Sequence, residues 1–180
     1  MIVLASTSPQ RRAILDQLGI PFDVFPPDFH EAPGTTPLER AAGKARSVPL
    51  GRGPVLGVDT EVLLGGELLG KPGTAAEAEQ MLAALAGRTH EVVSGLCLRT
   101  GAWEETREET TRVTFRRLTS RELARYVTAR EWEGRAGGYA VQGLGASLVE
   151  RIDGDYLNVV GLPAAALVDV LVERFPGVYF

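Results

Sequence analysis

The sequence predicts a mixed α/β fold, arranged as one domain or as two closely packed lobes. Short apolar runs of strand length alternate with segments whose apolar residues recur at helical spacing. Two-residue turns of the hairpin type interrupt this alternation, so the sheet should contain antiparallel as well as parallel strands. The length of 180 residues, with 44% hydrophobic and 23% charged residues, suits a globular chain of this class.

The first elements are a strand, a helix and a second strand. Residues 2–5 form an apolar run of strand length. Ser8 is the expected N-cap of the helix that follows, with Pro9 at its first position and Gly19 after its end. A second strand is expected over residues 22–25. This order predicts a polar loop between a buried strand and a helix N-terminus.

Three further helices are predicted from a Thr-x-x-Glu pattern, in which the two side chains cap each other's backbone. They should follow Thr36, Thr74 and Thr119, and end near residues 48, 87 and 129. A last helix should begin at Pro163 and end near Phe175.

The remaining strands are expected over residues 55–58, 62–64, 67–69, 89–98 and 106–115. The first of these should end at Asp59 and Thr60. Gly65-Gly66 is expected to be a two-residue hairpin turn, and Asp153-Gly154 should form the turn of another hairpin.

Composition excludes several classes of function. The chain has 19 basic and 23 acidic residues, a formal charge of −4, which argues against binding to nucleic acid. Cys97 is the single cysteine, so no intrachain disulfide or cysteine-based metal site can form. With two histidines in all, His30 and His90, a multi-histidine zinc site is not expected.

The N-terminal apolar run is too short for a signal peptide and has no basic residues before it. No stretch approaches the ~20 apolar residues of a membrane span. We therefore expect a cytoplasmic protein that does not bind membranes.

The loop and helix start at residues 6–12 form the first candidate site. Ser6 precedes a helix N-terminus, where free backbone N–H groups attract anions, and Arg11 and Arg12 add positive charge. Such an arrangement suits phosphate. The alternative is a plain capped helix with two solvated arginines.

Three single residues form further candidates. Asp59 follows an apolar strand and could bind Mg²⁺ or accept a proton from water, or serve as an ordinary turn residue. Lys71 lies on a loop framed by glycine and proline and could contact phosphate or remain solvated. Gln142, in a glycine-rich stretch, offers an amide that could pair with a nucleobase, or it lies in a tight bend. Taken alone, Glu31 and Lys44 are expected to be surface side chains.

In combination, the motifs of the chain match a known pattern. They are, in order, Leu4-Ala5-Ser6-Thr7-Ser8-Pro9 with Arg11-Arg12, Gly57-Val58-Asp59-Thr60, Leu69-Gly70-Lys71-Pro72, Gly87-Arg88-Thr89-His90-Glu91-Val92, Gly138-Tyr139-Ala140-Val141-Gln142-Gly143, Ile152-Asp153-Gly154-Asp155-Tyr156 and Gly161-Leu162-Pro163. With these motifs the chain resembles the Maf family of nucleoside triphosphate pyrophosphatases, also described as septum-formation inhibitors. The resemblance implies a single domain over residues 1–180, often dimeric. It also implies an elongated mixed sheet with flanking helices, whose two lobes enclose a cleft as in inosine triphosphate pyrophosphatases.

The resemblance also implies a reaction and roles for individual residues. A nucleoside triphosphate would be hydrolysed to the monophosphate and pyrophosphate with Mg²⁺ or Mn²⁺. Asp59 would activate water, and Glu31 would help to hold the metal or the water. The triphosphate would be held by Ser6, Arg11, Lys44 and Lys71. This chemistry needs an oriented water and positive charge for the leaving group.

Three positions carry the expected base preference. Thr60 and Gln142 are similar to the residues of a dTTP/UTP group in the family, and a glutamine amide can pair with both O4 and N3 of uracil or thymine. Gln10 departs from this pattern and points to relaxed preference. The alternatives are a 7-methyl-GTP or broad-specificity enzyme, or a nucleotide-binding regulator of septum formation without catalysis.

Overall fold

The computed structural model describes residues 1–51 and 53–179. Within them, seven strands form one sheet in the order β2-β1-β3-β5-β6-β7, with β4 paired to β3. β1 is parallel to β2 and β3, whereas β4 and β7 are antiparallel to their neighbours. The predicted mixed α/β fold is confirmed. The strands are β1 (Ile2–Ala5), β2 (Phe22–Val24), β3 (Val55–Leu64), β4 (Glu67–Leu69), β5 (Thr89–Arg99), β6 (Glu104–Phe115) and β7 (Val149–Asp153).

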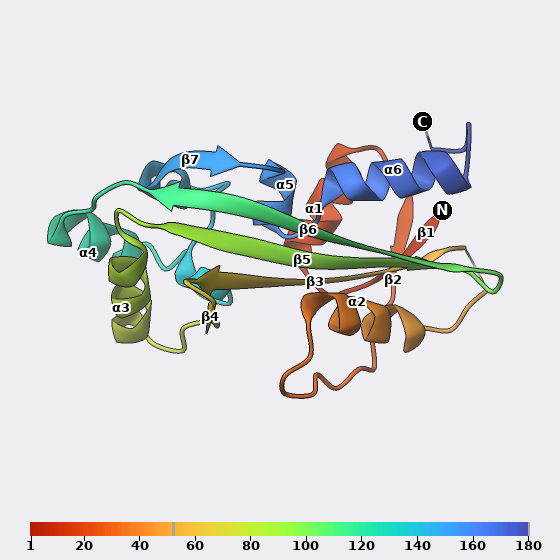
Figure 1. Cartoon of the computed structure of the whole chain (residues 1–180), viewed down its shortest axis with the longest axis horizontal. Coiled ribbons are helices and arrows are strands. Elements are labelled where there is room, and N and C mark those ends of the chain that lie inside the picture. Colours follow the sequence, from red (N-terminus) through yellow and green to blue (C-terminus); the bar gives the residue numbers. More distant parts are fainter. Residues whose placement is uncertain (52, 180) are drawn as a thin grey trace. The chain divides into compact units, whose positions relative to one another are not determined.

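Helices flank the sheet, as Figure 1 shows. The α-helices are α1 (Pro9–Gln17), α2 (Pro37–Arg46), α3 (Ala75–Leu85), α4 (Ser120–Thr128), α5 (Tyr156–Val160) and α6 (Ala164–Arg174). Two 3₁₀ helices, η1 (Ala136–Gly138) and η2 (Leu144–Leu148), follow α4.

The chain divides into two compact units. Unit 1 comprises Met1–Thr60, Ser94–Glu109 and Gly161–Phe180, and unit 2 comprises Glu61–Val93 and Thr110–Val160. The division falls inside β3, β5 and β6. The expectation of a single domain whose two lobes enclose a cleft depends on how these units are placed relative to each other. It therefore stays a prediction.

In unit 1, α2 lies on one side of the strands and α1 and α6 lie on the other (Figure 1). Alanines of α2 pack in a core with residues of β1, β3 and β5. Gly57 permits this close packing, because a Cβ there would overlap the backbone of α2 at Ala41 and Ala45. α2 is thereby held directly against the strand that carries Asp59.

Unit 2 has a larger core, in which residues of α3 and α4 pack against strand residues and the 139–148 segment. An aromatic cluster lies in it: the His90 and Tyr139 rings both pack edge-on against Phe115, with centroid distances of 5.1 and 4.8 Å. His90 Nε2 also lies 2.8 Å from the Tyr139 hydroxyl. Tyr139 and Val141 thus anchor the middle of the glycine-rich stretch in this core.

The helix starts largely follow the sequence pattern. Ser8 caps α1, and complete capping boxes with Thr36 and Thr119 begin α2 and α4. The third predicted box is only half present. Thr74 accepts from the Glu77 N–H at 3.2 Å, but the Glu77 carboxylate accepts from the Gly73 N–H instead.

Two strand predictions are wrong. β3 does not end at Asp59 and Thr60 but continues through them to Leu64, because α2 supplies charged partners that let a carboxylate remain in the sheet. Asp153-Gly154 is not a hairpin turn, because α5 follows β7. The Asp155 carboxylate accepts hydrogen bonds from the backbone N–H groups at the start of α5 and so favours a helix there.

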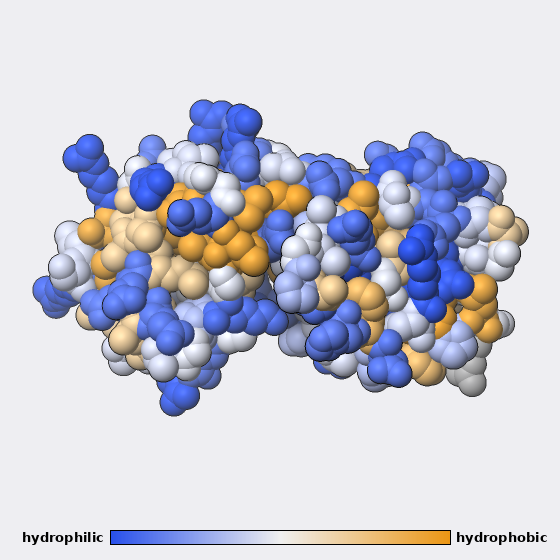
Figure 2. All heavy atoms as spheres, turned by 60° about the horizontal axis from the view of Figure 1, so that its bottom comes forward, coloured by the Kyte–Doolittle hydropathy of each residue, from blue (hydrophilic) through white to orange (hydrophobic). Residues whose placement is uncertain are grey.

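On the face shown in Figure 2, hydrophobic residues gather in a patch over the left part, and elsewhere they are interspersed with hydrophilic ones. Large apolar side chains are exposed at several described positions, such as Leu68 at 62% and Val178 at 65%. Scattered exposure of this kind is normal for a folded protein. Among the described residues, no helix combines the length and the apolar character needed to cross a membrane.

Candidate functional site

Asp59 is the centre of a charged cluster in unit 1. It lies within β3 and only 8% of its surface is exposed. A buried carboxylate requires compensation, because removing a charge from water costs several kcal/mol. Two cations of α2 provide it.

Arg40 and Lys44 are spaced four residues apart, so both extend from the same face of α2. The Arg40 Nε donates to Asp59 Oδ2 at 2.7 Å, and the Lys44 ammonium contacts Asp59 Oδ1. Each carboxylate oxygen therefore has its own cation. Both cationic side chains are largely buried, at 12% and 14% exposed.

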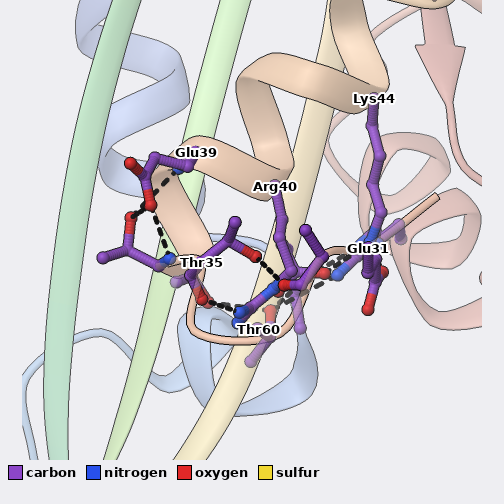
Figure 3. A network of polar contacts seen from close by, with 12 residues as sticks. Glu31, Thr35, Glu39, Arg40, Lys44 and Thr60 are labelled. Atoms are coloured by element: carbon purple, nitrogen blue, oxygen red, sulfur yellow. Dashed lines mark hydrogen bonds and ion pairs between the residues drawn. The ribbon is translucent and has the colours of Figure 1, made fainter. Parts of the chain in front are cut away.

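Glu31 joins the cluster through Lys44. Its Oε1 lies 2.6 Å from the Lys44 Nζ, while the Glu31 side chain remains 52% exposed. Figure 3 shows Arg40 and Lys44 reaching from α2 toward the segment that carries Glu31. Two carboxylates thus converge on one ammonium group. The expectation of a surface side chain is wrong for Lys44, which is largely buried, whereas Glu31 is exposed but paired.

Local packing explains how the Glu31 segment reaches α2. The Phe29 ring lies against Gly43, where any Cβ would overlap the ring. At the start of α2, Thr36 and Glu39 cap the helix, and Arg40 donates to the carbonyl oxygen of Thr35. The segment is therefore attached to α2 at both Phe29 and Thr35.

Arg11 forms a second polar centre in unit 1. Its Nε donates to the Gly161 carbonyl at 2.9 Å, and its terminal nitrogens donate to the hydroxyls of Ser6 at 3.0 Å and Thr60 at 3.4 Å. These partners are all neutral. Burial lowers the pKa of the enclosed guanidinium to about 10, although the charges of Asp59 and Glu31 oppose this shift.

Thr60 is held by the same network. Its hydroxyl lies 2.8 Å from the Ser94 hydroxyl, 3.4 Å from the Gly161 carbonyl oxygen and within reach of Arg11. Thr60, which the family resemblance linked to base preference, thus supports the Arg11 side chain in this structure.

The remaining residues of the 6–12 segment differ in their environment. Ser6 is 4% exposed and its hydroxyl accepts from Arg11 and from the Ser8 N–H. Gln10 accepts from the Ser8 hydroxyl at 3.0 Å. Arg12 is exposed and donates to the Thr7 carbonyl. Of the two predicted arginines, the structure brings only Arg11 into the buried network.

Lys71 and Gln142 belong to unit 2, and both are exposed. The Gly70 carbonyl beside Lys71 accepts from the Gly137 N–H at 3.1 Å. The Glu131 carboxylate accepts from the N–H groups of Leu144 and Gly145 and so fixes the segment after Gln142. The part that these two residues take in binding stays a prediction.

The donor set can be compared with the needs of a divalent cation. Among residues 1–51 and 53–179, no group of three or more His, Cys, Asp or Glu side chains could hold a metal. Mg²⁺ usually needs only one or two protein carboxylates, because substrate phosphates and water complete its shell. Asp59 and Glu31, converging on one cationic atom, fit this mode of binding.

Other reactive groups are unsuited to catalysis. Cys97 is fully buried, and burial raises the pKa of its thiol to about 12, so a thiolate nucleophile is not available. His90 is 1% exposed, and burial lowers its pKa to about 4. Neither side chain is therefore available for acid–base chemistry near neutral pH.

Sequence reasoning missed Arg40 and Ser94. Arg40 could have been found from its spacing of four residues to Lys44 on a predicted helix. No comparable signal marks Ser94, because it meets Thr60 only through the pairing of distant segments.

The chain also matches known proteins over most of its length. A family model described as Maf-like protein matches residues 1–174. Three relatives, each named dTTP/UTP pyrophosphatase, come from Myxococcus xanthus, Cereibacter sphaeroides and Pyrococcus furiosus and are 46%, 43% and 41% identical. The alignments cover 97%, 94% and 94% of this chain and 92%, 93% and 93% of those proteins. With the family motifs in place and a match that extends over almost all of its sequence, the chain belongs to the Maf family.

Proposed function

We propose that the protein hydrolyses dTTP and UTP to the corresponding monophosphate and pyrophosphate. The substrate class follows the names of its relatives. The observation that carries the chemistry is the pair of carboxylates, Asp59 and Glu31, that share Lys44 in the unit that also holds the buried Arg11. Such an enzyme would remove unwanted nucleotides from the precursor pool of the cytoplasm.

In the proposed reaction, a water oxygen attacks the α-phosphorus. The bond between that phosphorus and the oxygen bridging to the β-phosphorus breaks, and pyrophosphate leaves with the electron pair. Asp59 accepts the proton of the attacking water. An ionised carboxylate has about four lone-pair positions, so Asp59 can contact Arg40 and Lys44 and still accept from a water.

The cations would hold the charged groups of the substrate. Arg11 is suited to the triphosphate, because its hydrogen bonds fix the guanidinium without neutralising it. Lys44 and Lys71 would add further positive charge for the leaving group. A bound Mg²⁺ or Mn²⁺ would lower the charge of the phosphate oxygens as a Lewis acid, with Asp59 and Glu31 as its protein ligands.

Gln142 is proposed to recognise the base. An amide can donate to O4 and accept from N3–H of a pyrimidine. A carboxylate at this position would favour the positively charged 7-methylguanine, so Gln142→Glu should raise turnover of 7-methyl-GTP relative to dTTP. If the ratio of 7-methyl-GTP turnover to dTTP turnover is the same in Gln142→Glu and in the wild type, Gln142 does not recognise the base.

The first test is a panel of nucleoside triphosphates with Mg²⁺ and then Mn²⁺, in which pyrophosphate and orthophosphate are measured separately. We expect pyrophosphate, with dTTP and UTP as the best substrates. In ¹⁸O-labelled water the label should enter the monophosphate, because attack is at the α-phosphorus. Label in the pyrophosphate would contradict this mechanism.

Asp59→Asn separates an enzyme from a nucleotide-binding regulator. Because a neutral amide cannot accept the proton, turnover should fall by about 10² or more while nucleotide binding persists. The control is Asp169→Asn, on α6, which should keep wild-type turnover. Normal turnover in Asp59→Asn would remove Asp59 from its proposed role. Nucleotide binding by the wild type without pyrophosphate release would favour the regulator.

We further propose that residues 1–180 act as one domain and that the protein is a homodimer. Light scattering during size-exclusion chromatography measures the mass directly. A mass near 19.3 kDa would indicate a monomer and contradict the dimer.

A further inference from the structure

We propose that Arg40 is a positioning residue that orients the Asp59 carboxylate for catalysis. Arg40 bridges Asp59 Oδ2, at 2.7 Å, and the backbone carbonyl of Thr35. The inference rests on the proposed function, because it assigns to Arg40 the control of the group that would activate water. Arg40 is not among the candidate site residues that were selected from the sequence.

The geometry favours orientation over substrate binding. A guanidinium presents its N–H groups in a rigid planar fork. Two of those groups are directed at fixed acceptors of the protein, one on β3 and one just before α2. With Arg40 on Oδ2, the other oxygen of Asp59 faces Lys44, which also contacts Glu31. Arg40 therefore fixes the plane of the Asp59 carboxylate while its other oxygen contacts Lys44.

Burial makes this restraint effective. The Arg40 and Asp59 side chains are 12% and 11% exposed, and a charged hydrogen bond is stronger where water is excluded. Without Arg40, the carboxylate could rotate about its last torsion, because such sp³–sp² torsions are broad. Misorientation of a catalytic group slows the chemical step, whereas substrate binding by other residues is retained.

The test compares Arg40→Gln with Arg46→Gln. Arg46 lies on the same helix, is 62% exposed and pairs with Glu104, so its replacement also removes one ion pair of α2. For dTTP hydrolysis we expect Arg40→Gln to lower kcat by about tenfold or more. KM, and the Kd of a non-hydrolysable dTTP analogue, should change less than twofold. Arg46→Gln should keep wild-type kcat and KM.

Two further variants distinguish orientation from simple support of the fold. Arg40→Lys keeps the charge but loses the fork, and it should recover only part of kcat. Arg40→Ala should recover kcat on addition of millimolar guanidinium ion, whereas Asp59→Asn should not. If Arg40→Gln does not fold, Arg40→Lys decides: wild-type kcat in that variant would overturn the proposal.

The outcomes also separate this inference from the proposed function. If the wild type releases no pyrophosphate, the proposed function is wrong. If the wild type is active and Asp59→Asn is not, but Arg40→Gln keeps wild-type kcat, only the role of Arg40 is wrong. A parallel rise of KM and Kd in Arg40→Gln would instead make Arg40 a substrate-binding residue and overturn positioning.

Discussion

Buried polar groups occur in both units of the chain, but their chemistry differs. In unit 1 they include charges: Arg40 and Lys44 each contact Asp59, and Arg11 is held by neutral partners, among them the buried Ser6. In unit 2 they are neutral: Asn158 is fully buried and donates to the Val92 carbonyl and the Thr111 hydroxyl. His90 is enclosed by aromatic rings.

The difference separates function from architecture. A buried ion pair adds little net stability, because its desolvation offsets its attraction, but removing one partner alone is destabilising because the remaining charge loses its compensation. Buried neutral groups with hydrogen bonds can stabilise a unique packing. Variants that remove a charge in unit 1 should therefore lose activity in addition to stability, whereas variants in unit 2 should lose stability while the folded enzyme keeps its activity.

The largest effect is expected at Arg11. Arg11→Met removes a cation for the triphosphate, so kcat/KM for dTTP should fall on the order of 10³. Far-UV circular dichroism should remain that of the wild type. Arg46→Met serves as the control, since Arg46 contacts Glu104 at the surface, and its kcat/KM should not change. If kcat/KM of Arg11→Met falls by less than tenfold, the buried charges of unit 1 do not serve the reaction as proposed.

The next effect is a pH dependence of stability caused by His90. Burial lowers the pKa of His90 to about 4 in the folded state, from 6.5. Between these values only the unfolded chain binds the proton, so stability is complete above pH 6.5 and falls as pH decreases toward 4. The expected loss is about 3 kcal/mol at pH 4. Urea unfolding of wild type and His90→Gln at pH 4.5 and 7.5 measures it, and the variant should show a smaller dependence.

Asn158→Ala is the matched control for His90. It removes two hydrogen bonds of unit 2 without removing a titratable group. The free energy of unfolding should decrease by about 2 kcal/mol at both pH values, and kcat of the folded enzyme should remain. An equal pH dependence in wild type and His90→Gln would show that His90 is not its source.

The smallest effects compare two identical helix starts. Thr36→Ala in unit 1 and Thr119→Ala in unit 2 each remove a complete capping box and should cost about 1 kcal/mol of stability. Only Thr36→Ala should also lower kcat, because α2 carries Arg40 and Lys44. Thermal unfolding and saturating dTTP kinetics measure the two quantities. A decrease of kcat in Thr119→Ala alone would reverse the comparison.

Local patterns predict local structure in this chain. Ser8, Thr36 and Thr119 mark helix starts correctly because a cap involves residues that are near in sequence. The prediction fails at Asp59, since a polar residue after an apolar run is typical of a strand end. It also fails at Asp153-Gly154, where a turn signal is followed by a helix.

The mixed α/β class, most helix starts and, through the ordered motifs, the family could be predicted from the residues alone. Three features became known from the folded chain: β3 continues through Asp59, Arg40 shares this carboxylate with Lys44, and Thr60 supports Arg11. A charge can remain in a sheet only where other elements bring its partners. Lys44 and Arg40 lie 15 and 19 residues from Asp59 in the sequence, and Arg11 lies 49 residues from Thr60, separations that no local pattern encodes.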